Sequence, residues 1–468
     1  MDKIKILDQN TDRILRASAK IRAFLDALTD PKSLVETDVF LAGKSFTDGA
    51  DALGEGVVTG SAIINGVPVY LFAQNSEVLS GSLGAAQADK IVKNIYAAEK
   101  AGVPFISVID SAGARIGEGI SASEGFSKII KAAGEISGRV PHIAVVKGNC
   151  VGLMSVYLSM ADFVFADENA KISVTPPTVL AAVSKTNADA LKVKNAVPKT
   201  GGIAYIYKSE TELREKLGEL LALLPSDDSY IAKDDYADDL NRESPELNSS
   251  PLSDPYALLA AAADDGVYLE LYGGCVPEVK TALGRIAGIT VAFIAFEGGK
   301  FLSLAGIKKL SNFIFTISDF NIPLVSFVDC KGVEPSLSDE LNGLRDGAAS
   351  LMAAVGLSSN KKIAVITGGA IGYVYGALAS KAAGIDYTFA TVNAVISPIN
   401  PETAAVLIGG EDLKKAADPI AKRGELIKKY AEEAANPFVA AKDGYVDNII
   451  EPSLIRPYVA GVLTMLVR

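Results

Sequence analysis

Short runs of β-branched and aromatic residues alternate with alanine-rich stretches of helical period along most of the chain. Residues 10–36 come before this alternation and have helical periodicity with many charges. Residues 56–70 hold two apolar runs separated by Asn65-Gly66, which predicts a β-hairpin with a tight turn. Strands that alternate with helices are typical of layered α/β proteins, so we expect that fold class.

Residues 225–255 interrupt the alternation and are rich in Pro, Ser, Asn and Asp. This composition is typical of a linker or a covering loop. The chain has 468 residues, which is enough for two large domains or three small ones with substantial cores. We expect two domains, residues 1–245 and residues 246–468.

The two halves on either side of the linker resemble each other. The strand pattern that ends at Asp110 recurs at Asp329, an offset of 329 − 110 = 219 positions. A period this long indicates a duplicated domain and not a solenoid. Four segments match in the same order: 56–70 with 281–293, 101–110 with 320–329, 143–152 with 363–372, and 172–173 with 396–397.

In each half a predicted strand enters a glycine-bearing turn, at Gly152 and at Gly372, before an alanine-rich helix. Glycine lets the backbone approach a ligand closely, and free N–H groups at a helix start can stabilise negative charge. A tight strand-to-helix turn with no ligand explains either glycine taken alone. Because the turn recurs in both halves, we predict two backbone-amide sites.

Composition excludes several kinds of site. The single histidine, His142, lies in a predicted buried strand, where we expect a structural role, and one histidine excludes a multi-histidine metal centre. Cys150, Cys275 and Cys330 have no zinc spacing and suggest no disulfide framework, so we expect no metal. A net charge of −11 argues against nonspecific nucleic-acid binding, so no nucleic-acid partner is expected.

The apolar tract over residues 143–166 is interrupted by Lys147, Asn149 and Asp162, which argues against a membrane span. No apolar stretch typical of a secretory signal follows Met1. We therefore expect a soluble cytoplasmic protein.

One motif is specific enough to indicate a family. The segment Asp110-Ser-Ala-Gly-Ala-Arg-Ile-Gly-Glu-Gly119 is close to the Asp-Ser-Gly-Gly-Ala-Arg-Ile-Gln-Glu-Gly of the carboxyltransferase subunits of biotin-dependent acyl-CoA carboxylases and decarboxylases. Residues 56–70, 80–84 and 437–452 also follow that family's pattern. The resemblance covers roughly residues 38–460 and implies an α/β fold of two tandem crotonase-like domains built from repeated ββα units.

The resemblance also implies a chemistry that needs no histidine. Biotin would move the α-proton of a coenzyme A thioester, and the protein would supply two oxyanion holes of backbone N–H groups. The chain has no Met-Lys-Met biotinylation motif, so a separate biotin carboxyl carrier protein is the implied partner, with a biotin carboxylase or a membrane decarboxylase subunit. The family's shared active sites imply a homo-oligomer, a dimer or a hexamer.

The family's site residues carry over by position. Two roles stay open for Arg115: an ion pair with Glu118 or Asp110 that steadies the loop, or contact with the substrate. Asp110 and Asp329 are expected to brace strand ends. The resemblance implies a thioester hole at Gly152 and Leu153, a biotin hole at Gly372, Tyr373 and Val374, and an acyl-CoA pocket shaped by Ala112, Gly113, Ala114 and Arg115.

The sequence departs from the family at these positions. The family's Cys-Ala-Gly-Gly reads Cys150-Val-Gly-Leu153 in this chain. At the second turn, Tyr373 stands at a position where the family has glycine. Two alternatives therefore stay open. One is a non-catalytic assembly subunit that pairs with a standard homologue. The other is a crotonase-like decarboxylase or hydrolase that acts without biotin, for which the chain offers no convincing acid or base.

Overall fold

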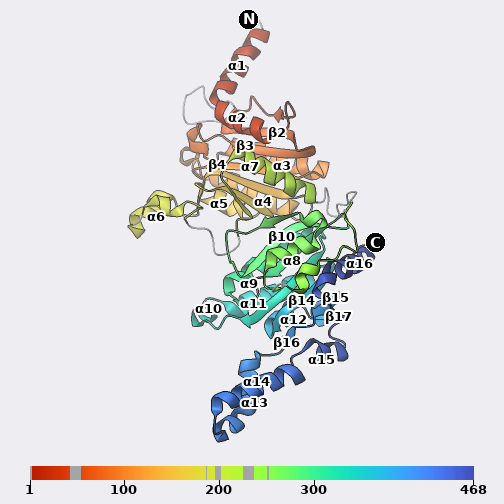
Figure 1. Cartoon of the computed structure of the whole chain (residues 1–468). Coiled ribbons are helices and arrows are strands. Elements are labelled where there is room, and N and C mark those ends of the chain that lie inside the picture. Colours follow the sequence, from red (N-terminus) through yellow and green to blue (C-terminus); the bar gives the residue numbers. More distant parts are fainter. Residues whose placement is uncertain are drawn as a thin grey trace. The chain divides into compact units, whose positions relative to one another are not determined.

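The structure is a computed structural model that describes residues 3–42, 54–185, 187–195, 202–224, 237–249 and 252–467. These residues form two compact units, one up to residue 224 and one from residue 237 onward (Figure 1). Much of the predicted linker lies outside the described residues. Within the described ranges no helix is both long enough and apolar enough to cross a bilayer.

The first unit contains a mixed sheet with the strand order β1-β2-β3-β4-β5-β6-β8, and β7 pairs with β5. The predicted hairpin is confirmed: β2 and β3 are antiparallel and turn at Asn65 and Gly66, which have φ values of 48° and 80°. From β3 onward neighbouring strands run parallel. The strands are β1 (Val35–Thr37), β2 (Val57–Ile64), β3 (Val67–Gln74), β4 (Phe105–Ser111), β5 (His142–Val151), β6 (Phe163–Asp167), β7 (Lys171–Ser173) and β8 (Tyr205–Tyr207).

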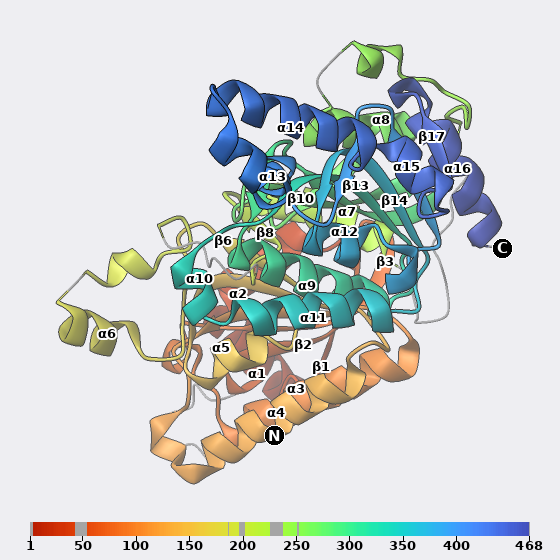
Figure 2. The ribbon, with the colours of Figure 1, turned by 90° about the horizontal axis from the view of Figure 1, so that it is seen from below.

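Helices cover this sheet, and Figure 2 shows α3 and α4 running side by side. They bury Ile91 and Phe126 in a core shared with Phe105 of the sheet. The helices are α1 (Lys3–Ala17), α2 (Ala19–Leu28), α3 (Ala85–Ala101), α4 (Ile120–Ile136), α5 (Leu153–Leu158), α6 (Pro177–Ser184) and α7 (Glu210–Leu223).

The predicted helical region over residues 10–36 is wrong at its C-terminal end. Helix α2 ends at Leu28, and residues 35–37 form the edge strand β1. Pro31 has no amide hydrogen to donate and disfavours helical backbone at Asp30, so the helix ends before this pair.

The second unit repeats this plan with the strand order β17-β15-β14-β13-β11-β10-β9, while β12 pairs with β13 and β16 with β14. Its hairpin, β10 and β11, turns at Ala287 and Gly288, which both have positive φ. The strands are β9 (Tyr268–Leu271), β10 (Val279–Ile286), β11 (Ile289–Phe296), β12 (Lys300–Leu302), β13 (Leu324–Val333), β14 (Lys362–Ile371), β15 (Tyr387–Thr391), β16 (Val395–Ser397) and β17 (Asn448–Ile450).

The helices α9 and α11 of this unit lie side by side, as α3 and α4 do in the first (Figure 2). The predicted α/β class and the duplication of a ββα arrangement are therefore confirmed. The helices are α8 (Pro255–Ala262), α9 (Leu304–Asp319), α10 (Leu337–Leu341), α11 (Leu344–Leu357), α12 (Tyr373–Leu378), α13 (Pro401–Lys415), α14 (Pro419–Glu433), α15 (Pro437–Lys442) and α16 (Ile455–Leu466).

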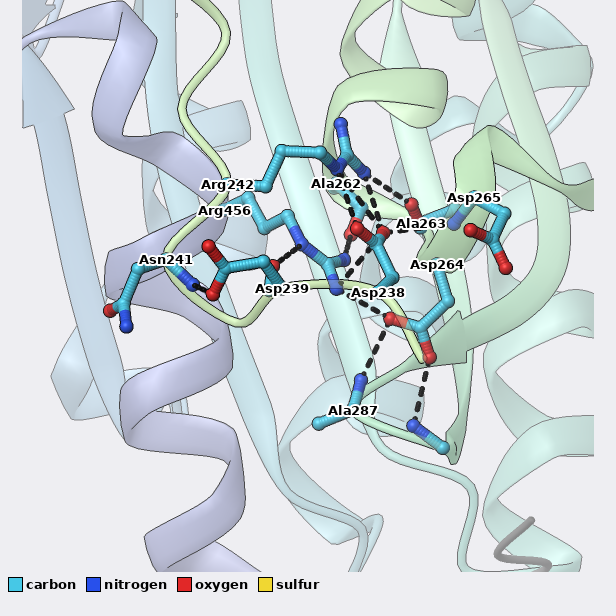
Figure 3. A network of polar contacts seen from close by, with 11 residues as sticks. Asp238, Asp239, Asn241, Arg242, Ala262, Ala263, Asp264, Asp265, Ala287 and Arg456 are labelled. Atoms are coloured by element: carbon cyan, nitrogen blue, oxygen red, sulfur yellow. Dashed lines mark hydrogen bonds and ion pairs between the residues drawn. The ribbon is translucent and has the colours of Figure 1, made fainter. Parts of the chain in front are cut away.

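A buried arginine of α16 ties the second unit together (Figure 3). Arg456 donates to the carbonyl oxygens of Asp239 and Ala262 and pairs with the carboxylates of Asp238 and Asp264. Asp264 also accepts the two N–H groups of the β10–β11 turn, at 3.0 and 2.8 Å. Through Arg456 and Asp264, helix α16 is thereby bonded to helix α8, to the segment at 237–249 and to the β10–β11 hairpin.

Candidate active site

The first predicted turn connects β5 to α5. Gly152 has φ 68° and ψ −140°, a backbone conformation that favours glycine, and its N–H donates to the carbonyl oxygen of Ser173 in β7 at 3.0 Å. Leu153 begins the helix, so its N–H has no intrahelical partner. The side chain of Leu153 is exposed. An amide available at this turn is therefore that of Leu153, while Gly152 shapes the turn.

The second turn, between β14 and α12, has the same construction. Gly372 has φ 57° and ψ −119°, and its N–H donates to the carbonyl oxygen of Ser397 in β16 at 2.8 Å. Tyr373 and Val374 are the first two residues of α12, so their N–H groups also lack intrahelical partners.

The bulk of Tyr373 is directed towards α11. Its hydroxyl donates to the carbonyl oxygen of Ala348 at 2.7 Å, and burial raises the pKa of the phenol. The large side chain that distinguishes this turn from the family pattern is thus held by a neighbouring helix.

The predicted pocket residues Ala112, Gly113, Ala114 and Arg115 form a loop beside the first turn. Gly113 has φ 101°, and a Cβ atom built on Gly152 would lie 3.9 Å from the Cα atom of Gly113. Backbone hydrogen bonds join the loop to Leu83, from Leu83 N–H to Gly113 and from Arg115 N–H to Leu83. The structure therefore brings Gly113 and Gly152 together, with Ala112 and Ala114 exposed.

The guanidinium of Arg115 is bonded to groups of the protein itself. The side chain is 8% exposed, and Nη1 lies 2.6 Å from Oε2 of Glu55 and 2.8 Å from Oε1 of Glu118. Glu118 also accepts the N–H of Ala85, the first residue of α3. The ion pair with Glu118, one of the two open interpretations, is present, and it fastens the loop to the start of α3.

The second unit has a counterpart of this loop that sequence reasoning missed. Gly332 has φ 107° and stands 332 − 113 = 219 positions after Gly113. The repeat offset could have identified it, although its neighbours differ. Glu334 takes the place of Arg115, since its N–H donates to Leu302 as the N–H of Arg115 does to Leu83.

The replacement of Arg115 by an acidic residue leaves space in the second unit. A cavity of about 390 Å³ lies beside Glu334. Its lining includes Glu278, Glu297, Lys300 and Ser303. The first unit has the guanidinium of Arg115 at the position of Glu334, whereas the second has an open pocket whose lining includes three glutamates and one lysine.

His142 lies at the opposite end of β5 from the turn at Gly152. It begins β5 and is buried, as predicted, with Nε2 2.8 Å from Oγ of Ser107 and 3.3 Å from the hydroxyl of Tyr157. Burial lowers the pKa of the imidazole to about 4, so it is neutral at pH 7. Asp110 and Asp329 each accept a backbone N–H of the neighbouring strand, which confirms their predicted bracing role.

Comparisons with known proteins agree with this architecture. A family model described as a carboxyl transferase domain matches residues 16–468. The alpha subunit of methylmalonyl-CoA decarboxylase from Veillonella parvula is 35% identical over 463 residues, covering 95% of this chain and 89% of that protein. The carboxyltransferase subunit of propionyl-CoA carboxylase from Haloferax mediterranei is 31% identical, covering 95% and 90%.

A solved structure is similar over almost the whole chain. The crystal structure of transcarboxylase 12S, a hexamer with methylmalonyl-coenzyme A and methylmalonic acid bound, matches with a TM-score of 0.92 at 30% identity. The match covers 99% of this chain and 94% of that one. The duplicated crotonase-like units, the paired turns and these relatives lead to one conclusion: the chain belongs to the carboxyl transferase domain family.

Proposed function

We propose that this chain transfers a carboxyl group between biotin on a separate carrier protein and an acyl-CoA, through two oxyanion sites made of backbone amides. The duplicated strand–glycine–helix turn carries the proposal, since the reaction develops negative charge on two oxygens, that of the thioester and that of the biotin ureido group. Relatives are named as carboxylase, decarboxylase and carboxyltransferase subunits, and no comparison supports a non-catalytic assembly subunit.

Each turn has a separate role in this proposal. Biotin, when bound, supplies the carboxyl group and the base for the α-proton. The N–H of Leu153 binds the thioester oxygen, and the N–H groups of Tyr373 and Val374 bind the ureido oxygen. Gly152 and Gly372 donate their own N–H groups to β7 and β16, so we assign them the shape of each turn. The acyl-CoA side is then the domain of residues 1–245, and the biotin side is that of residues 246–468.

The loop beside the first turn fits an acyl-CoA. Ala112 and Ala114 are small and exposed next to Gly152, so they leave room for an acyl group. Arg115 supports this loop through Glu55 and Glu118, because its guanidinium is already occupied by these carboxylates.

We extend the proposal to a homo-oligomer, a dimer or a hexamer, in the cytoplasm. Helix α6 exposes Val183 and α13 exposes Leu407 and Ile408, apolar side chains that a second copy would cover. The partners would be a biotin carboxyl carrier protein and a biotin carboxylase or membrane decarboxylase subunit. Cys150 and Cys330 form no disulfide, as is usual in a reducing compartment.

Removing a single amide hydrogen tests the function. In Leu153→Pro the first helical position loses its N–H, and proline is tolerated there. Carboxyl transfer from methylmalonyl-CoA to biotin should fall roughly 10²–10³-fold, the usual effect of one lost oxyanion donor. Leu153→Ala keeps the amide and should retain activity within about threefold of wild type, because the donor is unchanged.

Glu210→Pro places the same change at the first position of α7 and is the matched control, with activity expected near that of wild type. Light scattering gives the oligomeric state of every variant. Failure of the wild type to transfer carboxyl groups from or to acetyl-, propionyl- or methylmalonyl-CoA, with a carrier present, would contradict the proposed function. Equal losses in Leu153→Pro and Glu210→Pro would contradict the role of the amide.

A further inference from the structure

The strand before each turn changes its sheet neighbour shortly before the turn. Strand β5 pairs with β6 through residues 143–146 and with β7 through residues 149–151. Strand β14 pairs with β15 through residues 363–366 and with β16 through residues 369–371. Between the two ladders of each strand lie two residues, 147–148 in β5 and 367–368 in β14. They pair with no strand on the side of β6 and β7 or of β15 and β16. The ladder on that side is therefore interrupted shortly before each turn.

An aspartate of the preceding strand supports the backbone at this point in each unit. Oδ1 of Asp110 accepts the N–H of Asn149 at 3.0 Å, and Oδ1 of Asp329 accepts the N–H of Gly369 at 2.8 Å. Asn149 and Gly369 are the first residues of the short ladders with β7 and β16. Each carboxylate therefore fixes the residue at which the strand begins its final segment.

A glycine makes room for each carboxylate. A Cβ atom on Gly148 would lie 2.4 Å from Oδ1 of Asp110, and one on Gly368 would lie 2.3 Å from Cγ of Asp329. Both distances are shorter than a van der Waals contact, so a larger residue would displace the aspartate. The aspartate and the glycine form one device, which the duplication has kept in both halves.

The supported residue is close to the proposed donor along the chain. From Asn149 the backbone passes two residues paired with β7, then Gly152, whose N–H is bonded to Ser173, and then Leu153. In the second unit the path from Gly369 to Tyr373 is the same. Because the residues between them are hydrogen-bonded to β7 or β16, a shift at Asn149 or Gly369 would be passed along the backbone to the amide at the start of the helix.

We infer that Asp110 and Asp329 are positioning residues for the reaction, Asp110 for the thioester turn and Asp329 for the biotin turn. The inference rests on the proposed function. Each aspartate acts through a backbone N–H of the next strand. Each holds a backbone amide within the small tolerance that catalysis by preorganised donors requires.

Asp162 and Asp386 are matched controls. They accept the N–H groups of His142 and Lys362, at 2.7 and 2.8 Å, at the opposite ends of the same two strands. A substitution there removes the same kind of hydrogen bond without touching the segment that leads to a turn. A loss of stability alone should therefore be similar for both pairs of aspartates.

Two rates measured on the full chain separate positioning from folding. The first is decarboxylation of free N-carboxybiotin without acyl-CoA, and the second is carboxyl transfer from methylmalonyl-CoA to free biotin. Asp329→Ala should lower both rates, whereas Asp110→Ala should lower only the transfer, each roughly 10²-fold, the size of effect that about 1 Å of misplacement produces. Asp162→Ala and Asp386→Ala should leave both rates within about twofold of wild type, because the turns are not displaced.

The conservative variants keep the test decisive if the alanine variants do not fold. Asp110→Asn and Asp329→Asn retain an oxygen acceptor but lose its charge, which about halves the strength of such a bond, so a loss of about tenfold with the same division between rates is expected. Asparagine variants with wild-type rates, or equal effects of Asp110 and Asp162 substitutions, would overturn the inference. An inactive wild type would instead contradict the proposed function.

Discussion

The two units place an aspartate at the same hairpin turn, but they bury it to different extents. In the first unit Asp30 accepts the N–H groups of Asn65 and Gly66 and pairs with Arg214 of α7, and these two side chains are 28% and 32% exposed. In the second unit Asp264 accepts the N–H groups of the β10–β11 turn and pairs with Arg456 of α16. Its side chain is 11% exposed and that of Arg456 is 0% exposed. In both units a carboxylate accepts the two N–H groups of the hairpin turn. The helix that supplies the arginine, α7 or α16, determines how deeply that carboxylate is buried.

The opposite difference occurs beside the turns at Gly152 and Gly372, to which we assign the oxyanion sites. The first unit closes its loop with the buried ion pairs of Arg115, while the second has Glu334 at this place beside an open pocket. The first unit thus has its buried arginine in the loop beside the turn, and the second has it in the last helix, α16. The shared backbone of the two units does not require shared side-chain supports.

The largest expected effect comes from the buried arginine. Arg456→Met should lower the free energy of unfolding by about 3–5 kcal/mol, because it leaves the largely buried carboxylate of Asp264 without a counter-ion and removes one of the two arginines that pair with Asp238. Arg214→Met, at a partly exposed pair, should cost about 1 kcal/mol or less. Urea denaturation followed by hydrogen exchange in each unit measures both effects.

Arg345→Met is the control for these variants, since Arg345 is 89% exposed in its pair with Asp346 and should have no measurable effect on stability. Equal losses for Arg214 and Arg456 would show that burial does not distinguish the two units.

Acid should destabilise the first unit through His142. Its pKa is about 4 in the fold, below the ordinary value of 6.5, so between these values only the unfolded chain takes up the proton. The stability contributed by the neutral imidazole is complete above about pH 6.5 and falls by about 3 kcal/mol as the pH drops to about 4. Hydrogen exchange in β5, compared at pH 7 and pH 4.5, measures the change.

His142→Gln keeps a hydrogen-bonding group but cannot titrate, so this pH dependence should disappear. The second unit has no histidine because the chain has only one, and exchange in β14 provides an internal reference. A similar acid response in β14 would assign the effect to other groups.

The smallest expected effect concerns the side chain that distinguishes the second turn. Tyr373→Phe removes the hydrogen bond to Ala348 and should cost about 1 kcal/mol of unfolding free energy. Carboxyl transfer should stay within about twofold of wild type, because the backbone N–H remains. Parallel measurements of thermal unfolding and steady-state rates test this, and a tenfold loss of rate with unchanged stability would assign the hydroxyl a role in binding.

Local sequence motifs and their repeat predicted the backbone features of both units. The hairpin at Asn65-Gly66, the buried strand at His142 and the paired turns at Gly152 and Gly372 all follow from local patterns and a constant offset. Lys90 and Lys309 share that offset, 309 − 90 = 219, but lysines on helices are normally exposed, so the pattern does not predict their burial. Both are buried and donate to carbonyl oxygens of the hairpin strands, and burial lowers the pKa of each to about 8.

By itself the sequence determined the α/β class, the duplication, the family and the position of both glycine turns, because these depend on backbone geometry that short motifs encode. Only the tertiary structure decided which partners support that geometry. The aspartates that accept the hairpin-turn amides, Asp30 and Asp264, are 264 − 30 = 234 positions apart. The arginines that pair with them are 456 − 214 = 242 positions apart, so no constant offset relates the two ion pairs. Long-range partners are chosen by where helices pack, and packing depends on the whole fold and not on the spacing of residues along the chain.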